Sequence, residues 1–181
     1  GHDPQTGTKI WERGGFNPKE EGFQRVIASQ AVGEGIAVVP NRRGDFLTAI
    51  RLGGEGEVPD ANRIWEKHGL GADVPTPVIS GGDVYVLTDR GGVSKLDLKS
   101  GEVSWSHDLP RAKGNYYASP VLAGDLLYCA REDGVIFVAR VNGELELLAQ
   151  NRMGEKILAT PIPLRNGLLV RGEEHLFWIR Q

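Results

Sequence analysis

The sequence predicts an all-β fold of short strands, because of its glycine and proline content and its pattern of apolar segments. The 181 residues include 25 glycines and 10 prolines, and both residue types destabilise the interior of a helix. Stretches free of both are short for helices of ordinary length. The apolar segments are brief and rich in β-branched residues, and Gly, Asp and Asn turns typical of hairpins bound them at residues 36–39, 84–87, 135–138 and 168–170.

A repeated unit of roughly 40 residues organises these segments. Thr76-Pro77 recurs as Ser119-Pro120 and again as Thr160-Pro161, and Ser29-Gln30-Ala31-Val32 is an earlier, degenerate copy. After each copy come a turn, an apolar strand, a second turn and a third strand. The unit therefore supplies several short strands in a fixed order.

A second mark of the repeat, Asp-x3-Gly-x3-Trp, follows the third strand. Glycine permits a tight turn there, Asp can hydrogen-bond the turn backbone, and Trp offers a large flat surface to wedge between sheets. A Trp at such a site could instead stack a ligand, but its recurrence favours a structural role. Another copy ends at Trp65 after an insertion at about residues 52–62, so the docking residues are Asp3, Gly7, Trp11, Trp65, Asp97, Gly101 and Trp105.

Four short strands in a unit of this length are typical of the blades of a β-propeller. One twisted four-stranded sheet cannot bury both of its faces, so neighbouring blades must pack against each other. We expect a single propeller domain over residues 1–181, with about four blades' worth of sequence. Residues 1–12 would supply an outermost strand, about 25–66, 74–106 and 116–149 would form blades, and about 157–181 would give three strands of a last blade.

The units resemble the quinoprotein (PQQ-like) repeats of eight-bladed alcohol dehydrogenases and of the outer-membrane assembly lipoprotein propeller. In that family the Asp-x3-Gly-x3-Trp stretch is the tryptophan-docking motif, and here Lys95 stands where the family has Ala. Residues 43–51 and 174–179 look closer still to uncharacterised secreted propellers of planctomycete-type bacteria. The resemblance implies a bacterial protein of the periplasm or another extracytoplasmic location.

The strand order places both ends of the sequence inside a blade, which leaves three arrangements open. The chain could close as a four-bladed ring, two chains could pair as a homodimer that completes an eight-bladed ring, or the sequence could be a fragment of a longer ring. We favour half of, or a fragment of, a larger ring, because the resemblance associates these repeats with larger rings.

The resemblance also raises the alternative of a PQQ-dependent quinoprotein dehydrogenase. In those enzymes PQQ lies between a Trp and a disulfide of adjacent cysteines, beside a Ca²⁺ ion. Cys129 is the only cysteine, and its neighbours indicate a buried strand residue. The four histidines lack metal-ligand spacing. We therefore predict no catalytic, cofactor-binding or metal residue, with PQQ and calcium kept as the alternative.

Basic residues recur after the second strand of each unit, where the turns should share one rim of the propeller. They could bind an anionic partner. Acidic residues in the same turns nearly balance them, so the alternative is that these charged side chains are simply solvated and bind nothing. Two tyrosines begin an inner strand nearby, and one of them should belong to the core. The candidate rim contacts are Arg42, Arg43, Arg90, Arg131, Arg171, Tyr116 and Tyr117.

These observations favour a non-catalytic binding or scaffold module outside the cytoplasm, with a protein, peptide or glycan partner. A purely structural assembly module is a further alternative. The net charge of -3 favours neither nucleic acid nor an anionic membrane. No apolar run approaches the roughly 18 residues that a transmembrane helix needs.

Overall fold

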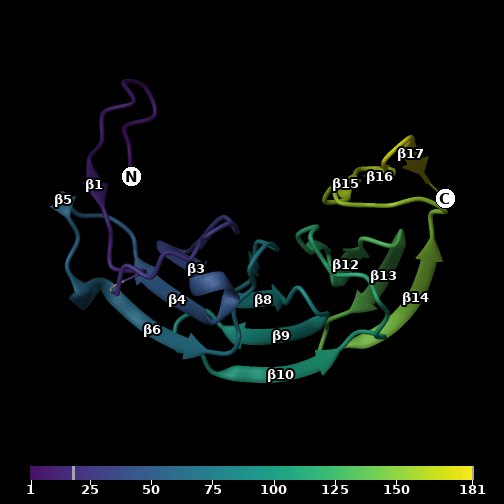
Figure 1. Ribbon diagram of the computed structural model, residues 1–181, viewed down its shortest axis with the longest axis horizontal. Coiled ribbons are helices and arrows are strands. Elements are labelled where there is room, and N and C mark those ends of the chain that lie inside the picture. The colour runs from purple at the N-terminus through teal and green to yellow at the C-terminus, as the bar shows by residue number, and fades with distance from the viewer. Residues whose placement is uncertain (18, 181) are drawn as a thin grey trace.

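The computed structural model describes residues 1–17 and 19–180. Its main sheets follow one another along an open arc, with the two termini at opposite ends (Figure 1). These main sheets are antiparallel, and three of them have four strands. The predicted all-β fold of four-stranded propeller blades is therefore confirmed, and the arc is not the closed four-bladed ring that the sequence left open.

The blades are numbered here in chain order. Blade 1 contains β2 (Ala31–Gly33), β3 (Ile36–Asn41), β4 (Phe46–Arg51) and β6 (Arg63–His68). Blade 2 contains β7 (Val78–Ser80), β8 (Asp83–Leu87), β9 (Gly92–Asp97) and β10 (Val103–Asp108). Blade 3 contains β11 (Val121–Ala123), β12 (Leu126–Arg131), β13 (Val135–Arg140) and β14 (Glu146–Arg152). Blade 4 contains β15 (Ile162–Leu164), β16 (Gly167–Arg171) and β17 (Leu176–Ile179).

The core lies between blades because successive residues of a strand face opposite sides of its sheet. In β8, Val84 and Val86 pack into the cluster shared with blade 1. The intervening Tyr85 and Leu87 pack into the cluster shared with blade 3. A third cluster joins blades 3 and 4 around Ile136, so each neighbouring pair of blades has its own apolar cluster.

A hydrogen-bonded ladder links the segments that precede the first strands of the blades, through the Ser or Thr that begins each copy of the Ser/Thr-Pro pair, including Ser29 of the degenerate copy. The Ser29 N–H donates to Thr76 Oγ1 at 3.0 Å, and the Thr76 N–H donates to Ser119 Oγ at 3.0 Å. The Ser119 N–H in turn donates to Thr160 Oγ1 at 3.1 Å. The repeated Ser/Thr-Pro pair is therefore a connection between blades as well as a mark of each blade.

The Asp-x3-Gly-x3-Trp element of blade 2 forms a tight turn between β9 and β10. Asp97 Oδ1 accepts the N–H groups of Lys99 and Ser100 at 3.0 and 2.7 Å. Gly101 has a φ of +69°, and a Cβ at this position would lie 2.7 Å from the ring of Trp65 in blade 1. The Trp65 indole N–H donates to Leu98 O at 2.9 Å, so the tryptophan of one blade packs on the turn of the next.

The same relation joins blades 2 and 3. Trp105 is buried between them, and its indole N–H donates to Gly143 O at 2.6 Å. Gly143 lies in the corresponding turn of blade 3, so the contact repeats from blade to blade.

The N-terminal segment does not join a blade. β1 (Trp11–Glu12) pairs in parallel with β5 (Gly56–Glu57), which belongs to the insertion that we expected to be an extended turn. That insertion also holds η2 (Asp60–Asn62), and η1 (Arg42–Gly44) follows β3. In the described residues no helix is long and apolar enough to cross a membrane.

Candidate binding groove on the rim

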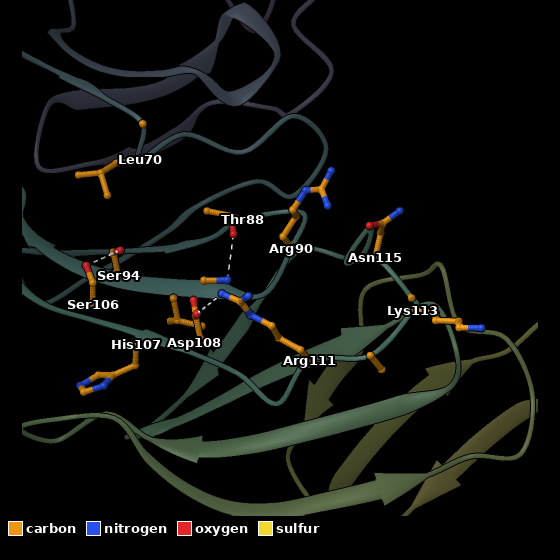
Figure 2. Close-up of a pocket in the computed structure, with 15 residues that line it drawn as sticks. Leu70, Thr88, Arg90, Ser94, Ser106, His107, Asp108, Arg111, Lys113 and Asn115 are labelled. Atoms are coloured by element: carbon orange, nitrogen blue, oxygen red, sulfur yellow. Dashed lines mark hydrogen bonds and ion pairs between the residues drawn. The ribbon is translucent and has the colours of Figure 1, made fainter.

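Two adjoining hollows lie along the turns and connections that link blades 1, 2 and 3. The larger has a volume of about 770 Å³ and is lined by Arg90, Lys113 and Asn115, among other residues (Figure 2). The smaller has a volume of about 410 Å³ and adds Arg43 and Tyr117. Both include Thr88, Arg90 and Asn115, and we call the two hollows together the rim groove.

Carboxylates fix the backbone around this groove. Asp89 accepts the N–H groups of Asp73 and Val74 at 2.7 and 3.1 Å, which ties the β8–β9 turn to the connection between blades 1 and 2. Glu132 in the next blade accepts the Asn115 N–H at 2.8 Å. These hydrogen bonds fix the positions of the two carboxylates, which both keep their negative charge.

The basic residues of the groove divide into paired and unpaired groups. Arg25 forms a two-pronged ion pair with Asp73, and Arg111 pairs with Asp108 at 2.8 Å. Arg43, Arg90 and Lys113 are exposed, and in the described part of the chain none of them takes part in an ion pair. The two hollows are lined by five basic residues and three acidic ones, which are Asp73, Asp89 and Asp108, so the groove has a local excess of positive charge.

An aromatic residue lies beside these cations. Tyr117 has 37% of its surface exposed, and its hydroxyl accepts a hydrogen bond from Asn115 Nδ2 at 3.1 Å. A partly exposed tyrosine held by a neighbour offers contact area with little loss of conformational freedom. The groove thus combines free positive charge with an ordered aromatic surface.

The other two candidates, the half-buried Arg42 and the exposed Arg171, lie elsewhere. Arg42 stacks over the Phe46 ring, with Cζ 4.2 Å from the centroid, and its Nε donates to Phe16 O at 3.2 Å. Arg171 lines a separate hollow in blade 4, next to Lys156. Neither residue lines the rim groove.

Two of the candidate rim contacts, Tyr116 and Arg131, are buried, and Tyr116 is the tyrosine of its pair that lies in the core. Tyr116 is 2% exposed and packs against Phe137, with ring centroids 6.2 Å apart. Burial raises its pKa to about 12. Arg131 is 4% exposed; it holds both carboxylate oxygens of Asp133 at 2.9 and 3.0 Å and donates to Pro110 O at 2.7 Å. These side chains hold blade 3 together and present no surface to a partner.

Cys129 lies in β12 and is 1% exposed. Burial raises the pKa of its thiol to about 12. A thiol that stays protonated at neutral pH is a poor nucleophile, so the prediction of a buried strand residue is confirmed.

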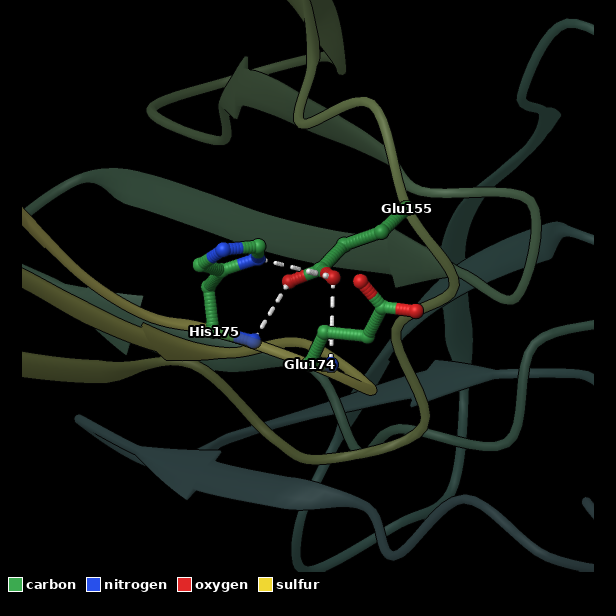
Figure 3. A group of neighbouring side chains, drawn as sticks. All are labelled: Glu155, Glu174 and His175. Carbon is green, nitrogen blue, oxygen red and sulfur yellow. Dashed lines mark hydrogen bonds and ion pairs between the residues drawn. The ribbon is translucent and has the colours of Figure 1, made fainter.

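One cluster that the sequence reasoning did not anticipate joins Glu155, Glu174 and His175 (Figure 3). Glu155 accepts the N–H groups of Glu174 and His175 at 3.1 and 3.0 Å, and lies 3.3 Å from His175 Nδ1. Burial alone would raise the pKa of Glu155, but the hydrogen bonds from His175 and the two backbone N–H groups lower it overall. The carboxylate therefore ties the connection after blade 3 to the β16–β17 turn, as Asp89 ties its own connection.

Antiparallel sheets stacked along an arc, each with alternate residues buried against its two neighbours, define the chain as a β-propeller of PQQ-like repeats. The family model described as outer membrane protein assembly factor BamB matches residues 1–145, and the chain belongs to that family. The expected closer likeness to planctomycete-type propellers stays a prediction.

Among curated relatives, the outer membrane protein assembly factor BamB of Salmonella typhimurium is 31% identical over 106 residues, which cover 58% of this chain and 26% of that protein. The chain thus matches about a quarter of the length of this relative. BamB from Moraxella catarrhalis superposes with a TM-score of 0.68 at 19% identity, over 96% of this chain and 50% of that chain. The computationally designed protein Ika4 gives a TM-score of 0.72 at 15% identity, over 97% and 99%. At these identities the two structures show the fold alone.

Proposed function

We propose that the chain is a non-catalytic propeller module whose rim groove binds an acidic segment of a partner protein. The observation on which the proposal depends is the division of charges in the groove, where the acids are engaged and Arg43, Arg90 and Lys113 are free. Tyr117 lies beside the free cations and adds contact area. Complementary charge across an interface contributes to specificity and to the rate of association.

The family supports a protein as the partner. Its relatives are named outer membrane protein assembly factors, and assembly requires contact with other proteins. The same name supports an extracytoplasmic location, in agreement with the periplasmic setting expected from the repeats. A propeller that presents loops from several blades on one rim suits this role, because loops on a rigid scaffold commonly supply binding residues.

The quinoprotein alternative gains no support from the residues around Cys129. Its thiol is buried within β12, and the sequence holds no second cysteine with which it could form the disulfide of those enzymes. PQQ with calcium stays the alternative cofactor proposal, and a quinone titration in the presence of Ca²⁺ would test it.

A fluorescence anisotropy titration with a labelled oligo-glutamate peptide tests the groove. The wild-type chain should bind the peptide, with an affinity that falls as salt rises because exposed charges are screened. A variant that combines Arg43→Ala, Arg90→Ala and Lys113→Ala should bind at least about tenfold more weakly, since each substitution removes a charged contact.

Arg171→Ala is the matched control, because Arg171 is an exposed rim arginine that lies outside the groove. This variant should keep the wild-type affinity. The proposal fails if the wild-type chain does not bind the peptide, or if the triple variant binds as well as the control.

A further inference from the structure

The turn between β13 and β14 contains an asparagine that is followed directly by a glycine. Asn142 and Gly143 are both exposed, and Gly143 has a φ of +101°. The turn is fixed at two points, since the Val141 N–H donates to Asp125 O at 2.9 Å and Gly143 O accepts the Trp105 indole N–H at 2.6 Å. The Asn142–Gly143 peptide bond therefore lies between one contact inside blade 3 and another that joins blade 3 to blade 2.

The corresponding turn of blade 2 is held by its own carboxylate. Asp97 Oδ1 accepts the N–H groups of Lys99 and Ser100, and Asp97 O accepts the Gly101 N–H at 2.9 Å. By the registers of β8 with β9 and of β12 with β13, Arg140 stands at the place of Asp97 in blade 3. Because an arginine side chain has no acceptor, the blade 3 turn lacks the hydrogen bonds that fix the turn of blade 2.

The two groups next to each other in the blade 3 turn are free of hydrogen bonds. In the part of the chain that the structure describes, the Gly143 N–H has no acceptor and the Asn142 side chain has no hydrogen-bond partner. Glycine has no side chain to hinder the approach of its nitrogen to the preceding side chain. The Gly143 nitrogen and the Asn142 side-chain amide can therefore close a five-membered ring.

We propose that the fold exposes Asn142 to spontaneous deamidation, and that isoaspartate at this position loosens the joint between blades 2 and 3. The Gly143 nitrogen attacks Cγ of Asn142, so that an N–Cγ bond forms and the Cγ–Nδ2 bond breaks. Nδ2 leaves as ammonia with the proton of the Gly143 N–H. Water then opens the cyclic imide at one of its two carbonyls. One opening gives aspartate, and the other gives isoaspartate, in which the main chain runs through the former side chain.

Isoaspartate changes the length of chain between the two fixed points of the turn. It adds one carbon atom to the main chain between Val141 and Gly143. Trp105 is buried between blades 2 and 3, so its indole N–H would lose its acceptor when the Gly143 carbonyl is displaced. Aspartate leaves the main chain and this contact as they are, although both products carry a new negative charge.

A second Asn–Gly pair, Asn166–Gly167, is a matched control within the same chain. Asn166 is exposed, as Asn142 is, but Gly167 begins β16 and pairs with Leu164 across a two-residue hairpin. Pro163, which has no N–H, takes the next pair, so Leu164 and Gly167 form a hydrogen-bonded pair. The sheet therefore holds the Gly167 nitrogen, and the folded chain should deamidate at residue 142 and spare residue 166.

Peptide mapping by mass spectrometry measures the two sites separately, after the wild-type chain is incubated in mildly alkaline buffer and digested in acid. The peptide with residue 142 should show the exchange of NH₂ for OH, with isoaspartate among its products, while the peptide with residue 166 stays unchanged. In guanidinium chloride, where neither turn is folded, both peptides should be converted.

Two results of this mapping would overturn the proposal. The first is a folded chain in which residue 142 is unchanged or residue 166 is converted equally fast. The second is a preference for residue 142 that persists undiminished in guanidinium chloride, because the flanking sequence and not the fold would then select the site.

The indole N–H signals of Trp105 and Trp65 in an NMR spectrum report the effect on the packing of the blades. In the chain with isoaspartate at residue 142 the Trp105 signal should shift, because its acceptor, Gly143 O, has moved. The Trp65 signal should stay, because its acceptor, Leu98 O, lies between blades 1 and 2. An unshifted Trp105 signal in that chain would overturn the proposal.

Two variants at the exposed Asn142 separate the altered main chain from the added charge. Asn142→Gln should keep both tryptophan signals after the same incubation, because glutamine would have to close a larger ring and reacts more slowly. Freshly prepared Asn142→Asp carries the charge on a normal main chain and should keep the wild-type Trp105 signal. A shift of that signal in fresh Asn142→Asp as large as in the isoaspartate chain would assign the effect to charge and contradict the loosened joint.

Discussion

Gly101 lies where two blades meet, with a positive φ and the Trp65 ring against the place where a side chain would begin. Gly7 has the same backbone shape, but a Cβ there would meet nothing within 4 Å. Alanine at Gly7 therefore measures the free energy lost to a positive φ alone. Alanine at Gly101 adds the free energy lost to the close contact with Trp65.

Gly101→Ala should lower the free energy of unfolding by about 2–4 kcal/mol, because it adds a contact that is too close to a backbone that is already unfavourable for alanine. Gly7→Ala should lower it by only about 1–2 kcal/mol. Denaturant titration of both variants measures the difference. Equal losses would mean that the tryptophan contact between blades is loose.

The ion pair between the buried Arg131 and the more exposed Asp133 predicts a loss of stability in acid. The hydrogen bonds from Arg131 are the largest cause that lowers the pKa of Asp133 below 3.8. A carboxylate whose pKa is lower in the folded state stabilises the fold above its unfolded pKa, and this contribution is lost as the pH falls towards the folded pKa.

Thermal unfolding between pH 5 and pH 2 (on the order of the range over which such a group titrates) measures this effect. Asp133→Asn removes the titrating group, so its stability should change less with pH below 3.8 than that of the wild type. A wild-type curve and a variant curve that fall in parallel would assign the acid sensitivity to other groups.

The sequence indicates which residue types recur, but it does not show which side chains point inward. Arg131 and Tyr116 recur at rim positions with Arg90 and Tyr117, yet the first pair is buried and the second is exposed. The difference comes from local partners. Asp133 follows Arg131 by two residues and captures its guanidinium, whereas Arg90 has glycine at the corresponding place.

At the scale of the strands, alternation and turn chemistry were sufficient to predict the blades. β8 and β12 each put successive residues into two different apolar clusters, which is the reason that their sequences read as continuous apolar runs. The pairing of β1 with β5 could not be predicted, because two residues of strand inside a glycine-rich insertion leave no periodic signal.

The Ser/Thr-Pro repeat also supports a prediction at this scale. Ser119 accepts the Thr76 N–H and donates its own N–H to Thr160, so it links three blades. Ser119→Ala should lower the free energy of unfolding by about 1–3 kcal/mol, because the Thr76 N–H is left without its acceptor. Ser119→Thr keeps the acceptor and should cost less in the same denaturant titration; equal losses would show that the hydroxyl contact contributes little.

At the scale of the whole molecule, the arc brings together side chains that the sequence separates widely. Arg43, Arg90 and Lys113 come from blade 1, blade 2 and the connection to blade 3, and only the packing of the blades places them around the same groove. In the sequence, the basic and acidic residues of the rim turns and connections are nearly equal in number. The sequence could not show that hydrogen bonds and ion pairs occupy the acids and leave three cations free.

The packing of the blades also explains the hydrogen bonds by which Glu155 holds the β16–β17 turn. In blade 2 a carboxylate of the turn holds the connection, through Asp89, whereas in blade 4 a carboxylate of the connection holds the turn, through Glu155. The acidic residues after the second strand of each repeat indicate that a carboxylate joins the turn to the connection. Whether that carboxylate lies in the turn or in the connection depends on the spatial arrangement.

The rim groove is the proposed binding surface of this propeller. Amide chemical-shift mapping by NMR, with the oligo-glutamate peptide added to the isotope-labelled wild-type chain, tests it most directly. If the peptide binds in the groove, the largest shifts should fall on Arg43, Arg90, Lys113, Asn115 and Tyr117, with little change on the outer strands β6 and β14. Shifts concentrated on those outer strands, or spread evenly over the surface, would contradict it.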